Sequence, residues 1–219
     1  MNYLKKLKLI VMISGEGTNL QALINAQIEK KINTEILAVI SDNEHATGLN
    51  RAKKANIPCI YLNRDLFSSK EEFETEISKN IIELDPDLII LAGFMRVLGK
   101  NFINKLKGKI INIHPSLLPA LKGLNTHERA IDSGNFFHGA SVHFVIAELD
   151  SGPSIMQYKI AIKKDDNKRT LKNRVHKGEY LILVETVKLF TMKNLKLDNN
   201  SIIINGEIMK NPILYEEDF

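Results

Sequence analysis

The chain has 219 residues and a mass of 24.8 kDa, which suits one large domain or one domain with a modest appendage. Its 44% hydrophobic and 26% charged residues are an ordinary globular balance, which excludes a largely disordered chain. The net charge of +4 has no basic block behind it and no aromatic residues interleaved with the short lysine pairs, so we expect no nucleic-acid partner.

The first residues mimic the basic start of a signal peptide. The uninterrupted apolar part, Leu9–Ile13, is too short for one, and a Gly-rich turn follows it, so we expect a first strand at Leu7–Ser14. No other run approaches a membrane span. Cys59 is the single cysteine and lies in an apolar run, which predicts a buried thiol. We therefore expect a cytoplasmic protein without disulfides or membrane contact.

Short β-branched runs alternate with amphipathic stretches through the first half of the chain. Predicted strands cover Leu7–Ser14, Glu35–Ser41, Cys59–Asn63, Leu88–Gly93 and Lys109–His114. Predicted helices cover Thr18–Lys31, Gly48–Asn56, Ser68–Asp87 and Lys100–Leu106. Ser68 or Ser69 would cap the third helix, and Pro86 would end it. This alternation predicts an α/β fold, with a mostly parallel twisted sheet and helices on both faces.

The pattern changes after Leu121. Gly139–Ile162 reads as a strand, a turn-rich loop and a second strand, so antiparallel pairing is expected there. Arg169–Asn194 is a long amphipathic stretch, and Asn205-Gly206 predicts a hairpin turn within Ser201–Lys210.

Three polar clusters fall at carboxyl ends of predicted parallel strands: Gly15–Asn19, Gly93–Arg96 and Asn112–His114. In such sheets ligands bind beyond those strand ends. The three clusters therefore predict one binding site on a single rim of the sheet.

The turn "SGEGTNL" joins a predicted strand to a predicted helix, where free backbone N–H groups can bind a phosphate. It matches neither the dinucleotide-binding nor the triphosphate-binding glycine motif, which disfavours those ligands. A tight turn with Thr18 as helix cap is the structural alternative.

Asn112 and His114 are two apart on a predicted strand, so their side chains project to the same side. An amide donor beside an imidazole is what a developing oxyanion requires. A strand-end histidine with an ordinary hydrogen bond is the alternative.

Ser141 and His143 share a strand face in the same way, and Asp150 precedes Ser151-Gly152-Pro153. Asp150 could start an ordinary turn, or it could deliver a carboxylate to the strand-end histidine and assist proton transfer. Spacing alone leaves both open.

Metal binding and serine hydrolysis are both disfavoured. No two of the six histidines have the i, i+4 spacing of helical metal ligands, and no partner cysteines exist, so we expect no metal. No G-x-S-x-G motif is present either.

Together, five segments resemble the phosphoribosylglycinamide formyltransferases, folate-dependent enzymes of purine synthesis. The segments are "ISGEGTNLQALI", "LAGFMRVL", "INIHPSLLPALKGLNTHERAI", "GASVHFVIAELDSGPSIMQ" and "RVHKGEY". The likeness runs from about Leu7 to Asn194 without a large gap. It implies a Rossmann-like formyltransferase domain over residues 1–195, with a phosphate-binding half at about 1–110 and a folate-binding, catalytic half at about 111–195. Residues 196–219 would be a hairpin-like extension.

In this family the amine of glycinamide ribonucleotide attacks the formyl carbon of 10-formyltetrahydrofolate, so the resemblance implies two small-molecule substrates and no tightly bound cofactor. The implied catalytic residues are Asn112, His114 and Asp150, with Ser141 and His143 in support. The implied ribonucleotide-binding residues are Gly17, Thr18, Asn19 and Glu179. The implied folate-binding residues are Lys70, Met95, Arg96, Val97, Leu98, Asn112, Ile146, Ala147, Glu148, Leu149 and Asp150. The protein would be a monomer or a homodimer.

Three positions depart from the family pattern. Lys70 stands where an arginine near the glutamate tail of folate is common, and a lysine keeps the charge but loses bidentate geometry. "PALKG" lacks the aromatic residue often found before the glycine, and Thr18 replaces a frequent serine.

Related and unrelated functions compete with this reading. Formyltetrahydrofolate deformylase, a hydrolase, is the principal alternative because its Asn, His and Asp would look alike, although it usually carries a preceding regulatory module. Methionyl-tRNA formyltransferase would need a substantial further domain beyond Leu195. A nucleotide-binding module without catalysis, or a basic RNA-binding protein, would leave Asn112, His114 and Asp150 without a role.

Overall fold

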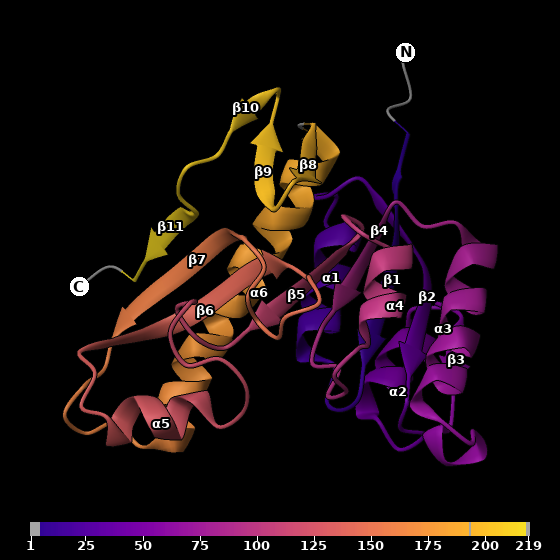
Figure 1. The fold of residues 1–219 in the computed structure, drawn as a ribbon. Coiled ribbons are helices and arrows are strands. Elements are labelled where there is room, and N and C mark those ends of the chain that lie inside the picture. The colour runs from indigo at the N-terminus through magenta and orange to yellow at the C-terminus, as the bar shows by residue number, and fades with distance from the viewer. Residues whose placement is uncertain (1–4, 193, 218–219) are drawn as a thin grey trace.

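The apolar runs of the chain form a large central sheet in the computed structural model, which describes residues 5–192 and 194–217 (Figure 1). The strands of this sheet are β1 (Leu7–Ile13), β2 (Thr34–Ser41), β3 (Cys59–Tyr61), β4 (Leu88–Leu91), β5 (Ile110–His114), β6 (Phe137–Phe144), β7 (Ser154–Ala161) and β11 (Ile213–Glu216). Their spatial order is β11-β7-β6-β5-β4-β1-β2-β3. All four residues of β4 are buried, as expected for a strand covered on both faces.

One strand of this large sheet, β6, runs in the opposite direction to both of its neighbours. The five strands from β3 to β5 pair in parallel, whereas β6 is antiparallel to both β5 and β7. The predicted α/β fold with antiparallel pairing in the C-terminal half is confirmed. The parallel pairing of β11 with β7 was not predicted.

Helices cover both faces of the sheet. They are α1 (Thr18–Ile28), α2 (Thr47–Lys54), α3 (Lys70–Leu84), α4 (Lys100–Lys105), α5 (Thr126–Asp132) and α6 (Lys168–Met192), with a 3-10 turn, η1, at Arg64–Leu66. One apolar cluster joins the sheet to α1, α2, α5 and α6, and a second joins it to α3 and α4. Within the described ranges, none of these helices has the length and apolar character needed to cross a membrane.

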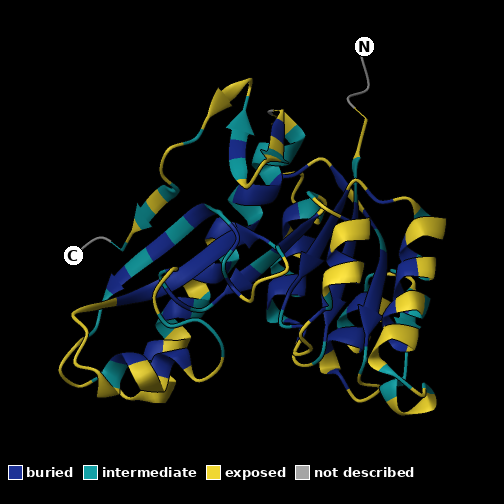
Figure 2. Ribbon diagram, in the orientation of Figure 1, coloured by how far each residue is buried: buried dark blue, intermediate teal, exposed yellow. Residues whose placement is uncertain are grey.

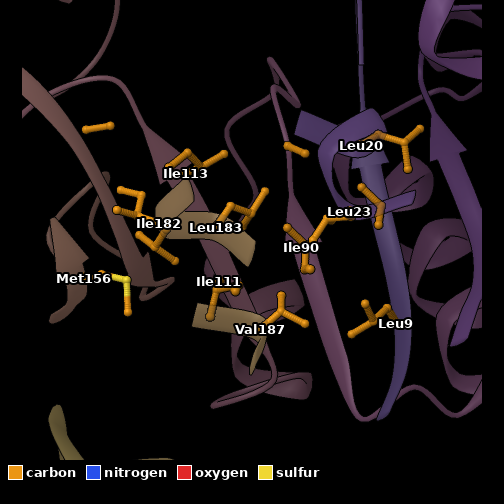
Figure 3. Close-up of a cluster of buried hydrophobic side chains, with 14 of the residues drawn as sticks. Leu9, Leu20, Leu23, Ile90, Ile111, Ile113, Met156, Ile182, Leu183 and Val187 are labelled. Carbon is orange, nitrogen blue, oxygen red and sulfur yellow. The ribbon is translucent and has the colours of Figure 1, made fainter. Parts of the chain in front are cut away.

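Helix α6 packs against the part of the sheet where the direction reverses. Figure 3 shows Ile111 and Ile113 of β5 close to Ile182 and Leu183 of α6, and these four side chains belong to one buried cluster. Figure 2 shows the buried central strands flanked by helices with exposed outer faces. The half of the molecule that carries β5 to β7 therefore depends on α6 for its core.

The starts of α3 and α1 test one predicted cap and one alternative reading of a turn. The Ser69 side chain accepts a hydrogen bond from the Glu72 N–H at 3.0 Å, so Ser69 caps α3 as expected. Thr18 does not cap α1: Gly17 occupies the cap position with φ of 67°, and no side chain bonds there. A Cβ on Gly17 would lie 2.6 Å from the Gly48 Cα, so this tight turn requires glycine.

Several boundaries differ from the expected ones for local reasons. Helix α1 ends at Ile28 rather than Lys31, since Lys30 has a positive φ of 57°. Strand β4 ends at Leu91 because Gly93 turns the chain with φ of 79°. Helix α6 ends at Met192, and Lys193, inside the predicted helix, lies outside the described residues.

The C-terminal residues form a small antiparallel sheet before they rejoin the large one. Its strands are β8 (Leu195–Asp198), β9 (Ser201–Ile204) and β10 (Glu207–Ile208). The predicted hairpin around Asn205-Gly206 is confirmed by the pairing of β9 with β10. Strand β11 then returns to the large sheet, so the segment after residue 195 contains more than a hairpin.

The core role of α6 predicts a large difference between two adjacent residues. Ile182 is fully buried, whereas Leu181 beside it is 42% exposed. We expect Ile182→Ala to lower the free energy of unfolding by about 2 to 5 kcal/mol, because it leaves a cavity under β5 to β7. Leu181→Ala should change it by less than about 1 kcal/mol. Urea unfolding of both variants checks this, and equal losses would contradict the packing described.

Candidate active site

The carboxyl ends of β1, β4 and β5 meet at one edge of the sheet, as the strand registers require. Met12 of β1 pairs with Leu91 of β4, and Leu91 pairs with Asn112 of β5. A cleft of about 400 Å³ opens at this edge. It is lined by the end of β5, the segment after β4, residues 123–127, the loop after β6 and the start of α6.

Most of the residues assigned to folate line this cleft. They are Met95, Arg96, Val97, Leu98, Asn112, Ile146, Ala147, Glu148, Leu149 and Asp150. Three of them, Met95, Val97 and Leu149, are large apolar side chains more than half exposed, and they lie on loops from two strand ends. An exposed apolar rim of this kind suits a flat, largely apolar ligand.

His114 lies between two hydrogen-bond acceptors at the end of β5. Its Nε2 donates to the Leu121 carbonyl at 3.0 Å, and its Nδ1 lies 3.4 Å from Asp150 Oδ2. The side chains of His114 and Asp150 are both 7% exposed. An acceptor against each ring nitrogen suits the imidazolium form, which carries a proton on both.

Asp150 reaches His114 because the loop after β6 folds back over the strand ends. Its backbone adopts the left-handed region with φ of 46°, and the Gly123 N–H donates to its Oδ2 at 2.9 Å. A carboxylate that accepts a backbone N–H beside an imidazole is held in place from two sides. Of the two readings of Asp150, the structure favours a carboxylate placed beside the strand-end histidine over an ordinary turn residue.

His143 fixes the orientation of Asn112. The Phe144 carbonyl can only accept, so His143 Nδ1 carries the proton of that 2.9 Å bond. Burial lowers the pKa of His143 to about 4, although Phe144 and Asp150 oppose this, so the ring is neutral near pH 7. Its Nε2 then accepts from Asn112 Nδ2 at 3.2 Å. The 3.7 Å approach of His143 Nε2 to Asp150 Oδ1 is accordingly not an ion pair at that pH.

Ser141 acts on the segment after β5 rather than on the cleft. Its hydroxyl donates to the Ser116 carbonyl at 2.7 Å and accepts from the Leu118 N–H at 3.1 Å. Gln157 also donates to it, at 2.9 Å. Ser141 thus fixes the chain that follows His114.

Asn19 and Glu179 meet although they are far apart in the sequence. Asn19 Nδ2 donates to Glu179 Oε2 at 2.9 Å, and both side chains are buried. Burial raises the pKa of Glu179, while His176 and the bond from Asn19 oppose the shift. Asn19 Oδ1 has no hydrogen-bond partner, which leaves an acceptor at the turn "SGEGTNL".

Lys70 and Thr18 do not line the cleft. Lys70 begins α3, where its Nζ lies 3.6 Å from Glu74 Oε1, and Glu74 in turn accepts the Gly99 N–H at 2.7 Å. Thr18 lies in a separate groove between α1 and α6, beside Tyr180. Among the described residues no cluster of three or more His, Cys, Asp or Glu could hold a metal ion.

Comparison with known proteins identifies the family. A family model described as formyl transferase matches residues 7–187. The phosphoribosylglycinamide formyltransferase of Haemophilus influenzae is 42% identical over 92% of this chain and 95% of its own. The solved structure of that enzyme from Coxiella burnetii, in complex with CHES, has a TM-score of 0.91 and 45% identity, over 96% of this chain and all of its own.

The chain belongs to the formyl transferase family. The predicted resemblance and the enzyme class, a formyltransferase, are confirmed. A solved formyltetrahydrofolate deformylase from Pseudomonas syringae has a TM-score of 0.84 at 24% identity, which shows a shared fold alone. The comparisons thus favour the transferase over the deformylase alternative.

Sequence reasoning missed one wall of the cleft in this formyltransferase. Thr126 and His127 of α5, with Lys168 and Lys172 of α6, line it, and none of them was predicted. Helix α5 has seven residues, too few to show a helical period. The stretch "GLNTH", which runs into the start of α5, was the available signal for this wall.

His127 of that wall and His138, which contacts it, are both kept neutral near pH 7. His138 Nε2 and His127 Nδ1 form a hydrogen bond of 3.1 Å, and their rings pack edge to face. Burial and the nearby His138 lower the pKa of His127 to about 3. Burial and His114 lower the pKa of His138 to about 4.

These depressed values predict a loss of stability in acid. Between about pH 6.5 and pH 4, His127, His138 and His143 bind protons in the unfolded chain but not in the folded one, so stability falls as the pH falls. As the pH falls from 7 to 5, each of these three histidines should lower the free energy of unfolding by about 1 to 2 kcal/mol. In urea unfolding, the loss of unfolding free energy between pH 7 and pH 5 should be about 1 to 2 kcal/mol smaller in His138→Gln than in wild type. His45→Gln, at an exposed histidine, should leave it unchanged. The same dependence in wild type and His138→Gln would contradict the assignment.

Proposed function

We propose that this formyltransferase transfers the formyl group of 10-formyltetrahydrofolate to the amine of N1-(5-phospho-D-ribosyl)glycinamide, in de novo purine synthesis. The convergence of Asn112, His114 and Asp150 at one cleft carries the proposal. The names of its relatives supply the ribonucleotide substrate. The folate is a co-substrate here, and no tightly bound cofactor or metal enters the reaction. The proposal places the enzyme in the cytoplasm, with small molecules as its partners.

The reaction proceeds by direct attack of the amine nitrogen on the formyl carbon. A new C–N bond forms, the formyl oxygen becomes an oxyanion, and the bond to N10 of the folate then breaks. One proton leaves the amine nitrogen and one arrives at N10. The Asn112 amide and the His114 imidazolium stabilise the oxyanion, and Asp150 favours the charged imidazole and assists the proton transfer, directly or through water.

The orientation of Asn112 supports its role. Because its amide nitrogen already donates one N–H to His143, the remaining N–H is the one available to a formyl oxygen. His114 Nε2 already donates to Leu121, so the formyl oxygen competes with that carbonyl for the ring proton. The oxyanion accepts more strongly than a neutral carbonyl, which gives the transition state the advantage.

The two substrates occupy different parts of the site in this proposal. The pterin lies in the cleft between residues 95–98 and 146–150, where apolar side chains form the rim. The ribonucleotide lies at Gly17, Thr18 and Asn19, with its phosphate at the start of α1 and its ribose at Glu179. The Asn19–Glu179 bond supports this assignment, since it joins two of the four residues. Lys70 is outside the cleft and would reach only the glutamate tail.

Catalytic variants should lose turnover and retain binding. We expect His114→Ala and Asp150→Asn each to lower kcat by about a hundredfold or more, with little change in the affinity for either substrate. Asp165→Asn, which changes an exposed acidic residue, should leave kcat at the wild-type value. The rate of tetrahydrofolate release, measured with a chelator present, gives kcat. The mass of the formylated product confirms its identity. Wild-type turnover in either variant would refute the assignment, and folate release without the ribonucleotide would indicate a hydrolase.

Glu179 should act on the ribonucleotide alone. We expect Glu179→Ala to weaken ribonucleotide binding about tenfold or more, because a charge-assisted hydrogen bond to the ribose is lost. Calorimetric titration of each substrate separately tests this, with Glu83→Ala at an exposed site of α3 as the matched control. An equal loss of folate affinity would contradict the division of the site.

A further inference from the structure

Two strained segments meet beside the catalytic pair. Leu121 and Asp150 are not glycines, yet both adopt left-handed backbone conformations, with φ of 54° and 46°. Such conformations are unfavourable for residues with a Cβ, and they persist where neighbouring contacts hold them. The contacts that join these two segments therefore decide where the catalytic groups lie.

The segment Leu121–Gly123 contacts both catalytic groups through its backbone. The Leu121 carbonyl accepts from His114 Nε2 at 3.0 Å, and the Gly123 N–H donates to Asp150 Oδ2 at 2.9 Å. Lys122 lies between these two contacts. A shift of this segment would change the positions of His114 and Asp150 together.

The side chain of Lys122 bonds to the residue next to Asp150. Its Nζ donates to Ser151 Oγ at 2.5 Å, and the same hydroxyl donates to the Leu149 carbonyl at 2.9 Å. The bond chain from Lys122 thus reaches the residues on both sides of Asp150. Glu148 lies 3.7 Å from the ammonium, but it is 76% exposed, so water screens that ion pair. The bond to Ser151 is the one that sets geometry.

We propose that Lys122 is a positioning residue for the formyl transfer, which joins the loop of Asp150 to the segment that holds His114. The inference rests on the proposed function for its effect on turnover. Lys122 touches neither the reacting atoms nor the Asp150 carboxylate through its side chain. It acts by keeping Gly123 against Asp150 and Leu121 against His114. Catalytic geometry held to a fraction of an ångström is sensitive to the loss of one such restraint.

Lys122→Met removes the donor and keeps the length of the side chain, whereas Lys122→Arg keeps a charged donor. We expect Lys122→Met to lower kcat roughly tenfold to a hundredfold, with both KM values within about twofold. Lys122→Arg should recover most of the rate. Lys164→Met, at an exposed lysine in the turn after β7, should match wild type.

A second measurement needs no substrate. In the free protein the Gly123 amide should exchange with solvent about tenfold faster in Lys122→Met than in wild type, because its bond to Asp150 opens more often. Ser151→Ala should produce the same effect, and the double variant should be no worse than the more affected single variant.

The outcomes separate the two proposals. Unchanged kcat, or a lower kcat with unchanged Gly123 exchange, would overturn the positioning role of Lys122. Additive effects of Lys122→Met and Ser151→Ala would also overturn it. If the wild-type protein transferred no formyl group, the proposed function would fail, while the exchange comparison would still decide whether Lys122 holds the two segments together.

Discussion

The buried contact between His114 and Asp150 is the interaction on which the rest of this site depends. Both groups are more than nine-tenths buried, and a carboxylate removed from water is costly unless a partner charge and hydrogen bonds offset the loss. The Gly123 N–H and the His114 ring supply that compensation. Without these two contacts the buried carboxylate would have no partner to offset its loss of hydration.

The fold makes this contact possible through one antiparallel strand, β6. Parallel strands β1, β4 and β5 bring the predicted clusters to one edge, as their registers show. Antiparallel β6 places His143 opposite Asn112 and Ser141 opposite His114. The loop after β6 can then fold back and carry Asp150 to the same place. Figure 1 shows α6 lying across this half of the sheet. The buried side chains of α6 pack against β5, β6 and β7, the strands that carry the site.

The sequence was sufficient for the features that depend on local pattern. Continuous apolar runs predicted β1, β4 and β5. The strand-end rule predicted one site for three clusters: Gly93–Arg96 and Asn112–His114 line the cleft, whereas Gly15–Asn19 do not. Period 2 correctly placed Asn112 with His114 and Ser141 with His143. A serine cap for α3, at Ser68 or Ser69, was recognisable from residue type, and the structure assigns it to Ser69.

Features that depend on long-range contacts could not be predicted. The pairing of β11 with β7 and the carbonyl of Leu121 at His114 follow from how distant segments pack, which no local pattern encodes. Thr18 was the structural alternative for a helix cap because its type suits one, yet Gly17 holds that position, where it lies close to Gly48. Glu179 entered only through the family resemblance, since a buried glutamate on a long helix has no sequence signature of its own.

A double-mutant cycle in kcat on His114 and Asp150 tests the central claim most directly. If the two groups work as one unit around the formyl carbon, His114→Ala combined with Asp150→Asn will lose no more rate than the more damaging single change. The account would be contradicted if the factor by which His114→Ala lowers kcat were the same in the wild-type protein and in Asp150→Asn. The two losses of rate would then multiply in the double variant.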